Sequence, residues 1–206
     1  LAEDGREARV DDGALPTWAR GLLAAALRSS PGVSDRGELP HPTDRAVVDG
    51  AARLGVTTTL ERPQWRRLHE LPFEPGRGFH AALGATSDGL WLSVKGAPEV
   101  LLPRCDRRSL GEVVSPLDER ERAAVLTHAE RLAGEGLRVL AVAEREASEA
   151  RDLDDERIGR LIFRGFVTMS DPPRSTAAVA IARLQAAGID LIMITGDHPR
   201  TARRIA

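Results

Sequence analysis

Residues 79–95 read FHAALGATSDGLWLSVK, two apolar segments separated by Ser87-Asp88-Gly89. An Asp-Gly pair between extended segments is typical of a tight turn, because glycine accepts a positive φ angle without steric cost. The stretch therefore predicts an antiparallel β-hairpin with strands at 79–86 and 90–95. Another extended segment, at 65–73, comes before it and is expected to join the same sheet.

Helical patterns surround the hairpin, with apolar side chains recurring every three to four residues. We predict helices at 15–29, 43–54, 98–104 and 117–133. Two further apolar segments predict strands, at 137–143 and 161–169. The charged run at 144–157 lacks a core pattern and is predicted to be a solvated loop or helix face.

The pattern changes near Ser170. Residues 174–187 predict a helix, residues 189–194 form a continuous apolar run, and Asp197 is placed to cap another helix. An alternation of strand and helix is typical of a parallel sheet. The predicted fold class is therefore α+β. An antiparallel sheet flanked by helices spans residues 1–169, and an incomplete parallel α/β unit spans residues 170–206.

Composition excludes several classes of protein. The formal net charge of -2 provides no overall basic field, which argues against a dedicated nucleic-acid binder. Cys105 is the only cysteine, so neither an intramolecular disulfide nor a cysteine-cluster zinc site can form. No apolar run approaches the ~20 residues that cross a bilayer. The chain begins at Leu1 rather than Met, and we expect it to be a piece of a larger protein.

Lys95 is the only lysine among the 29 Lys and Arg residues, and the sequence has no Asn and no Tyr. A high-GC genome explains this usage, because the codons of these three residues are AT-rich. A lysine in such a background suggests a position that needs a compact ammonium group. Lys95 ends the predicted hairpin, where it is expected to enter a cleft and donate to a phosphate or base acceptor. Gly96 would leave room for close approach of a ligand.

Two other residues, Phe73 and Arg138, each have two roles that fit the sequence. Phe73 ends an expected strand and could stack on a purine, although a core position is the alternative. Arg138 begins an otherwise apolar strand and must pair or reach solvent, so it is either a structural ion pair or a phosphate contact.

Thr195-Gly196-Asp197 follows the apolar run of the C-terminal unit, at the edge where ligands of open α/β sheets collect. The Thr195 hydroxyl, beside free N–H groups of a helix N-terminus, suits a phosphoryl oxygen. An ordinary turn in which Asp197 caps the helix is the alternative.

Six segments, taken in order, resemble P-type cation-transporting ATPases. They are HPTDRA at 41–46, LPF at 71–73, KGAPE at 95–99, GLRVL at 136–140, DPPR at 171–174 and MITGD at 193–197. The resemblance covers residues 42–206. It implies a nucleotide-binding domain over 1–169 and part of a phosphorylation domain, of haloacid-dehalogenase-like fold, over 170–206.

The resemblance also implies a site. Phe73 would stack on adenine near Asp44, and Lys95 with Gly96 would line the base and phosphate side. Arg77 and Arg138 would approach the phosphates. In the second domain the implied nucleotide-binding residues are Asp171, Thr195, Gly196 and Asp197, of which Thr195 and Asp197 are the implied catalytic residues; no metal ligand is assigned.

Two departures from the family pattern are visible. Gly78 stands where the family usually has the second member of a basic pair, which removes one phosphate contact. The Asp-Lys-Thr-Gly-Thr motif, whose Asp becomes phosphorylated, is absent, and so is the later Gly-Asp-Gly segment that helps hold Mg²⁺.

The activity implied by the resemblance is ATP-driven cation transport through an aspartyl phosphate, with ATP and Mg²⁺ as cofactors. This chain is expected to bind ATP without hydrolysing it. Its implied partners are the remaining phosphorylation, actuator and transmembrane domains of one full-length chain, in the cell membrane of a high-GC bacterium. Its lysine pentapeptide and Leu-Pro-Phe segment resemble the branch that moves Ca²⁺, Mg²⁺, Na⁺ or H⁺, which we favour, whereas His41-Pro42 resembles the pair with which heavy-metal pumps hold adenine. Ion choice depends on membrane helices that these motifs do not include. The alternatives are a soluble haloacid-dehalogenase-like phosphatase fragment and a non-catalytic regulatory domain.

Overall fold

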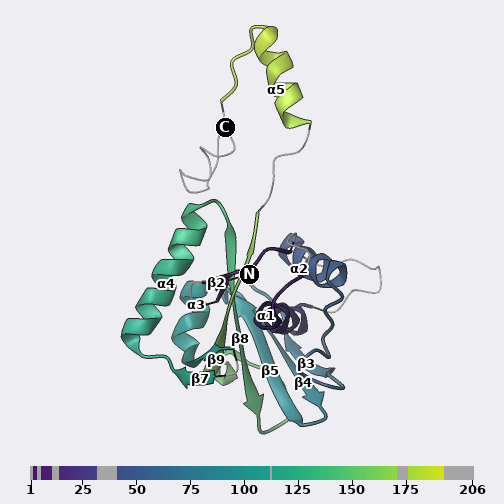
Figure 1. Ribbon diagram of the computed structural model, residues 1–206, viewed down its shortest axis with the longest axis vertical. Helices are drawn as coiled ribbons and strands as arrows, with labels where there is room; N and C mark the ends of the chain where they lie inside the picture. Colours follow the sequence, from purple (N-terminus) through teal and green to yellow (C-terminus); the bar gives the residue numbers. More distant parts are fainter. Residues whose placement is uncertain are drawn as a thin grey trace.

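The computed structural model describes residues 2–3, 6–10, 14–31, 41–111, 113–170 and 176–192. Its elements are shown in Figure 1. In chain order they are β1 (Ala2–Glu3), β2 (Arg6–Glu7), α1 (Thr17–Arg28), α2 (Pro42–Arg53), β3 (Arg66–Leu71), β4 (Phe79–Thr86), β5 (Gly89–Gly96), α3 (Pro98–Leu101), η2 (Leu102–Arg104), β6 (Cys105–Leu110), β7 (Val113–Pro116), α4 (Glu119–Gly134), β8 (Arg138–Ala147), η3 (Asp155–Arg157), β9 (Leu161–Met169) and α5 (Ala177–Ala186).

A nine-stranded sheet forms the centre of the fold, in the order β2-β1-β9-β8-β5-β4-β3, with β6 attached to β9 and β7 to β6. Strand β6 runs parallel to β9, whereas the other pairs are antiparallel. The expected antiparallel sheet is therefore correct for all pairs but one, and the sheet is mixed. Strands β1, β2, β6 and β7 are not among the predicted strands.

The predicted hairpin is confirmed as β4 and β5. Thr86 pairs with Gly89 across the turn, and the register continues to Phe79 opposite Gly96. Gly89 has a φ of 132°, a value that a residue with a side chain rarely adopts. This register places His80 directly opposite Lys95.

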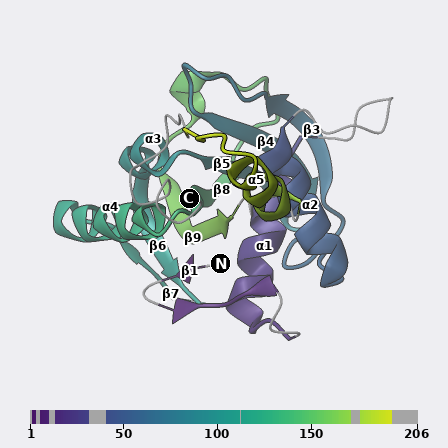
Figure 2. The same ribbon diagram turned by 90° about the horizontal axis from the view of Figure 1, so that it is seen from above.

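Helices cover both faces of the sheet (Figures 1 and 2). Helices α1 and α2 pack on one face, where Val142 of β8 and Val167 of β9 belong to their hydrophobic cluster. Residues of α3 and α4 form a second cluster with Ala141 and Ala143, which project from the opposite face of β8. This alternation follows from the two-residue period of a strand.

Helix α1 is buried on almost all sides, since residues 21–26 are all excluded from solvent between the sheet and α2. This explains its nearly continuous apolar sequence. Helix α4 is buried only at Ala129 and Leu132, and it begins with a capping box between Asp118 and Glu121. The segment predicted as one helix at 98–104 is an α-helical turn followed by a 3₁₀ turn.

The prediction for 144–157 is wrong at its start. Strand β8 continues to Ala147, and Glu144 in this part of the strand is only 1% exposed. A buried carboxylate looks like a surface residue in a hydrophobicity pattern, and its partner Arg28 lies 116 positions away in the chain. Segment 148–160, which we call the β8–β9 connection, includes the 3₁₀ turn η3 and returns to β9.

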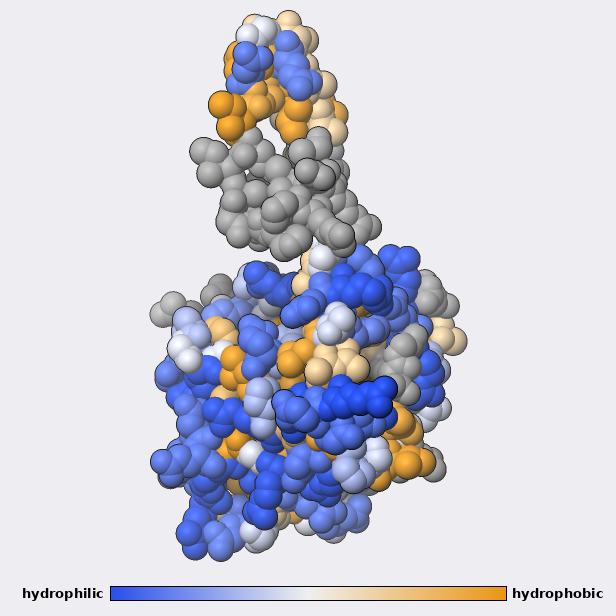
Figure 3. All heavy atoms as spheres, turned by 90° about the vertical axis from the view of Figure 1, so that its left-hand side faces the viewer, coloured by the Kyte–Doolittle hydropathy of each residue, from blue (hydrophilic) through white to orange (hydrophobic). Residues whose placement is uncertain are grey.

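Of the elements predicted in the C-terminal unit, only the first helix is confirmed, as α5 (Ala177–Ala186). Helix α5 has no buried residue, and its apolar side chains are exposed in Figure 3. Residues 189–192, expected to begin a buried parallel strand, form no strand and are exposed. A strand needs a neighbour to complete its backbone hydrogen bonds, and none of the described residues pairs with this run. The parallel α/β unit is therefore not confirmed.

Candidate functional site

Lys95 lies at the end of β5, where its side chain is 5% exposed. Its ammonium Nζ is 2.8 Å from Asp44 Oδ1, whose side chain is 6% exposed. Nζ also donates to the Ser29 carbonyl at 2.6 Å and to Ser30 Oγ at 3.0 Å. An ammonium group has three N–H donors, so all three are used within the protein.

Two helix ends converge on this ammonium group. Ser29 is the C-cap of α1, and Asp44 lies in the first turn of α2. A cation is favoured at the C-terminal end of a helix, where the helix dipole is negative, and an anion is favoured at the N-terminal end, where it is positive. The ion pair therefore lies where both helix dipoles support its charges. Arg67 donates to the carbonyls of Arg28 and Ser30 at the same end of α1.

Burial lowers the pKa of Lys95 from its ordinary value to about 8, and the nearby Asp44 carboxylate opposes that shift. Burial also lowers the pKa of His80 to about 4, with a further contribution from the charge of Lys95. At neutral pH the Lys95 ammonium group thus remains charged and the His80 imidazole is neutral. Both ring nitrogens of His80 are buried without a hydrogen-bond partner among the described residues.

Phe73 is 39% exposed in the segment that follows β3. Its ring lies 5.2 Å from the ring of His41, in an edge-to-face arrangement. His41 is the N-cap of α2, one helical turn before Asp44. The structure therefore gathers an exposed aromatic ring and a buried ion pair at the N-terminal end of α2. The expected alternative, a core position for Phe73, is not what the structure shows.

Gly96 contributes in a different way from the one predicted. A Cβ atom at Gly96 would lie 2.5 Å from Phe79 Cβ and 2.6 Å from the Gly78 carbonyl oxygen. The Gly78 carbonyl also accepts a hydrogen bond from the Ala97 N–H at 2.9 Å. The absent side chain of Gly96 makes room for the protein's own backbone, so the room expected there for a ligand is already filled.

Gly78 itself has a φ of 73°, in the left-handed region that favours glycine. A Cβ atom there would lie 3.0 Å from Val100 Cγ2. The missing second basic residue thus has a structural reason, because a side chain at this position would be strained.

Arg77 points to carboxylates. Its Nε donates to Asp155 Oδ1 at 3.1 Å, its Nη2 lies 3.3 Å from Glu74 Oε1, and its Nη1 donates to the Pro72 carbonyl at 2.5 Å. These contacts fix the segment that bears Phe73 to the β8–β9 connection. An approach of Arg77 to a phosphate group would require release from Asp155 and Glu74.

Arg138 begins β8, next to β5, three positions before Ala141, which pairs with Gly96. Its side chain is exposed, so it reaches solvent at the same end of the sheet as Lys95. The other four expected site residues, Asp171, Thr195, Gly196 and Asp197, lie outside the described residues.

A buried network positions α1 beside the site. Arg28 Nε donates to Glu144 Oε1 at 3.0 Å, and Ser93 Oγ donates to the same oxygen at 2.6 Å. Ser93 projects from the same face of β5 as Lys95, two residues away. Burial acts to raise the pKa of Glu144, but the charges of Arg28, Arg164 and Arg62 together hold it below its usual value. The network therefore ties the C-terminal end of α1, which holds Lys95, to the sheet.

Sequence reasoning missed three participants. His80 could have been found by counting outward from the turn, since the hairpin register fixes its partner as Lys95. Ser29 and Ser30 gave no signal, because they look like ordinary residues at the end of a helix. Chemically, the arrangement offers an exposed aromatic face, a neutral buried imidazole and an embedded ammonium group.

No helix among the described residues is both long and apolar enough to cross a membrane. Within the same ranges, no group of three or more His, Cys, Asp or Glu side chains is arranged to hold a metal ion.

A family model and individual relatives both match this chain, and they agree on one family. Residues 24–176 match the family model described as P-type ATPase, cytoplasmic domain N. The chain is 37% identical over 196 residues to the probable cation-transporting ATPase I of Mycobacterium tuberculosis, with 90% of this chain and 12% of that protein aligned.

Two relatives with named ions also match. The potassium-transporting ATPase alpha chain 1 of Xenopus laevis is 36% identical over 188 residues, covering 80% of this chain and 18% of that protein. The calcium-transporting ATPase 1 of Bacillus cereus is 32% identical over 165 residues, covering 80% of this chain and 19% of that protein. The chain thus spans less than a quarter of the length of each of these relatives. It belongs to the P-type ATPase family, and residues 24–176 are its cytoplasmic domain N.

Proposed function

We propose that this chain binds ATP as a cytosolic part of a P-type cation-transporting ATPase. The single observation that carries the proposal is that the exposed Phe73 ring contacts His41, the N-cap of α2, and the first turn of the same helix bears the Asp44 of the buried Lys95–Asp44 pair. An aromatic ring that is open to solvent can stack on a purine, which is worth about 1–3 kcal/mol per base. Both features lie at one end of the sheet, beside the N-terminus of α2.

Lys95 has two possible roles in this proposal, and the geometry favours one. Its three donors are already bonded to Asp44, Ser29 and Ser30. A direct contact with a nucleotide would cost one of those bonds. Lys95 therefore acts mainly by fixing α1 and α2 around the base, and by keeping a positive charge beneath it. Arg138, exposed on the next strand, is better placed to meet a phosphate group.

The rest of the catalytic cycle would involve residues outside this chain. In the proposed cycle an Asp of the full-length protein attacks the γ-phosphate of ATP, and Mg²⁺ enters bound to the phosphates. We propose that residues 170–206 are the first returning part of the phosphorylation domain to which this Asp belongs, with Asp171, Thr195, Gly196 and Asp197 on the side that faces the phosphates. The chain alone would bind ATP without hydrolysing it. The mycobacterial relative is consistent with a high-GC bacterium as the source.

The proposal is tested by titrating ATP into the ¹⁵N-labelled 206-residue chain and following amide NMR shifts. We expect saturable shifts centred on Phe73, Lys95 and Gly96. Phe73→Ala should weaken binding about tenfold, since it removes the stacking surface. Val114→Ala is the matched control, because Val114 is an exposed apolar residue on the distant strand β7.

Two results would overturn the proposal. The first is an absence of saturable shifts with ATP, which would favour a regulatory domain without a working nucleotide site. The second is an equal affinity for wild type, Phe73→Ala and Val114→Ala. Steady release of phosphate in proportion to pure protein would separately refute the claim that the chain alone is inactive.

A further inference from the structure

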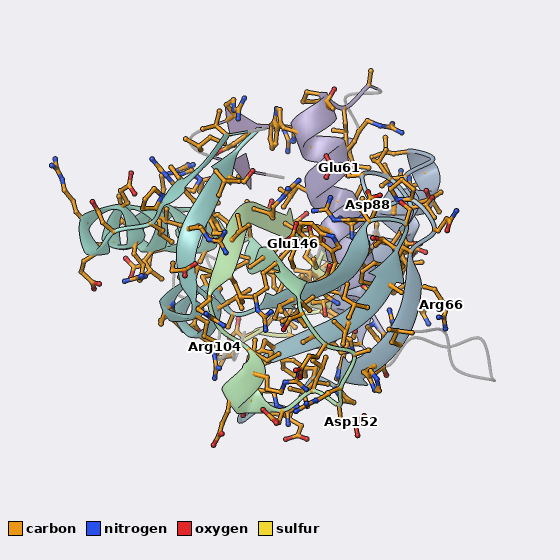
Figure 4. All side chains as sticks on the ribbon, turned by 90° about the horizontal axis from the view of Figure 1, so that it is seen from below. Glu61, Arg66, Asp88, Arg104, Glu146 and Asp152 are labelled. Atoms are coloured by element: carbon orange, nitrogen blue, oxygen red, sulfur yellow. The ribbon has the colours of Figure 1, made fainter. Side chains whose placement is uncertain are left out.

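A cavity of about 330 Å³ lies between the sheet and the β8–β9 connection. Its apolar lining includes Leu83 of β4 and Leu92 of β5, and Arg145, Arg157 and Arg160 line it as well. Figure 4 views this end of the molecule, with Glu146 and Asp152 labelled. Small-molecule sites commonly measure about 300–1,000 Å³, so the volume is at the lower end of that range. Along β5, Leu92 lies three residues toward the hairpin turn from Lys95, so the cavity is distinct from the site described above.

The three arginines carry uncompensated charge. Among the described residues, none of the guanidinium groups of Arg145, Arg157 and Arg160 forms an ion pair with a carboxylate. Arg145 instead donates to three carbonyls, those of Gly159 at 2.9 Å, Glu146 at 2.8 Å and Arg157 at 3.0 Å. Burial lowers the pKa of Arg145, and so do the charges of Arg160 and Arg157. The charges of Arg157 and Arg160 are therefore close enough to Arg145 to repel it.

The backbone holds this arrangement in place despite the repulsion. Arg157 donates from its side chain to the Asp152 carbonyl at 2.7 Å, and its N–H donates to Asp154 Oδ1 at 3.0 Å. Arg160 has a φ of 52°, which is uncommon for a residue with a side chain. Strain and like-charge repulsion at one position are characteristic of a functional site rather than of a stabilising one.

Two acidic residues also line the cavity. Glu149 forms an ion pair with Arg151, whose Nε lies 2.8 Å from Glu149 Oε2. Its charge is therefore compensated by a residue other than Arg145, Arg157 and Arg160. Glu156 is exposed. The three arginines thus outnumber the acidic groups, and planar guanidinium forks suit the oxygen atoms of phosphate.

We propose that this cavity binds a small oxyanion of the phosphate class, either inorganic phosphate or the phosphate group of a small ester. Arg157 and Arg160 bind its oxygen atoms, while Arg145 holds the surrounding carbonyls and supplies further positive charge. The site is independent of the proposed ATP site. It lies against the connection whose Asp155 holds Arg77, so an anion bound here contacts the segment that fixes the Phe73 region.

The test is a titration of the ¹⁵N-labelled chain with inorganic phosphate, with sodium chloride added to keep the ionic strength constant. We expect saturable amide shifts within residues 145–160. Arg157→Gln and Arg160→Gln should each raise the dissociation constant about tenfold or more, which corresponds to the loss of one charge-assisted hydrogen bond. Arg66→Gln is the matched control, because Arg66 is an exposed arginine on β3 of the same sheet.

Repeating the titration with glycerol phosphate distinguishes the free ion from an ester, since the preferred ligand binds more tightly at the same residues. Circular dichroism establishes that each variant is folded. Shifts that chloride alone reproduces, or equal phosphate affinity in all four proteins, would overturn the proposal. So would phosphate shifts centred on Phe73 and Lys95, because they would assign the anion to the ATP site.

Discussion

Lys95 Nζ lies 2.8 Å from Asp44 Oδ1, and this ion pair joins β5 to the first turn of α2 with almost no access to solvent. Removing one partner of a buried ion pair typically costs about 3–5 kcal/mol, because the other charge is left without compensation. We expect Asp44→Asn to lower the free energy of unfolding toward this range. Urea denaturation at neutral pH measures the change. Asp49→Asn, at an exposed position of the same helix, should have little effect, and equal losses in the two variants would contradict the expectation.

The same ammonium group makes stability depend on alkaline pH. The folded-state pKa of Lys95, about 8, is below its ordinary value of 10.5. Between these pH values the unfolded chain holds more protons on Lys95 than the folded chain does. Stability contributed by this residue therefore rises with pH across the window. The total is at most on the order of 3 kcal/mol, from about 1.4 kcal/mol per pKa unit.

Comparison with Lys95→Met isolates this effect. The difference in unfolding free energy, wild type minus variant, should rise between pH 8 and pH 10.5 and stay level between pH 6 and pH 7. Cys105, whose pKa burial raises to about 12, acts in the opposite direction, but it is present in both proteins and cancels. A difference that stays constant throughout would show that the folded-state pKa of Lys95 is not lowered.

Glu144 gives a third prediction. Its carboxylate accepts from Arg28 and Ser93 in a site that is 1% exposed. Glu144→Gln keeps the shape of the side chain but leaves the Arg28 charge uncompensated, so we expect a loss of about 3–5 kcal/mol in unfolding free energy. Glu146→Gln, two residues along the same strand and exposed, is the control. The idea fails if both glutamates tolerate the substitution equally.

Local patterns predicted the hairpin well, because its turn chemistry and its apolar segments both depend on neighbouring residues. Strands β4 and β9 have the predicted boundaries, and the register from the turn places His80 opposite Lys95. Helices α1 and α2 were also found, to within two residues at each end.

Long-range pairing is what the sequence could not reveal. Glu144 looked like a surface residue because Arg28, its partner, is distant in the chain. Gly96 looked like a gap for a ligand, whereas the structure fills the space with Gly78 and Phe79. Strand β7 has exposed Val113 and Val114, and β6 is its one pairing partner among the residues that the structure describes. It therefore lacks the alternation of buried and exposed side chains by which a strand is recognised in a sequence.

The last prediction concerns Gly78, where we expect a lysine to lower stability and to strengthen ATP binding. A lysine there would restore the second basic residue of the family pattern. The φ of 73° and the nearby Val100 side chain make any side chain strained, so we expect Gly78→Lys to cost about 1–3 kcal/mol of unfolding free energy. If the proposed ATP site is correct, the added cation should nevertheless lower the dissociation constant of ATP, provided that the variant is folded.

Gly76→Lys is the matched control for this substitution. A Cβ atom at Gly76 meets nothing within 4 Å, so its substitution should leave stability nearly unchanged. Urea denaturation of both variants measures the effect of backbone strain on stability, and ATP titration measures the effect of the added charge on nucleotide binding. If Gly78→Lys and Gly76→Lys are equally stable, the backbone at Gly78 is not a constraint, and the missing basic residue needs another explanation. If Gly78→Lys is less stable and binds ATP more tightly, backbone geometry explains why this chain lacks that phosphate contact.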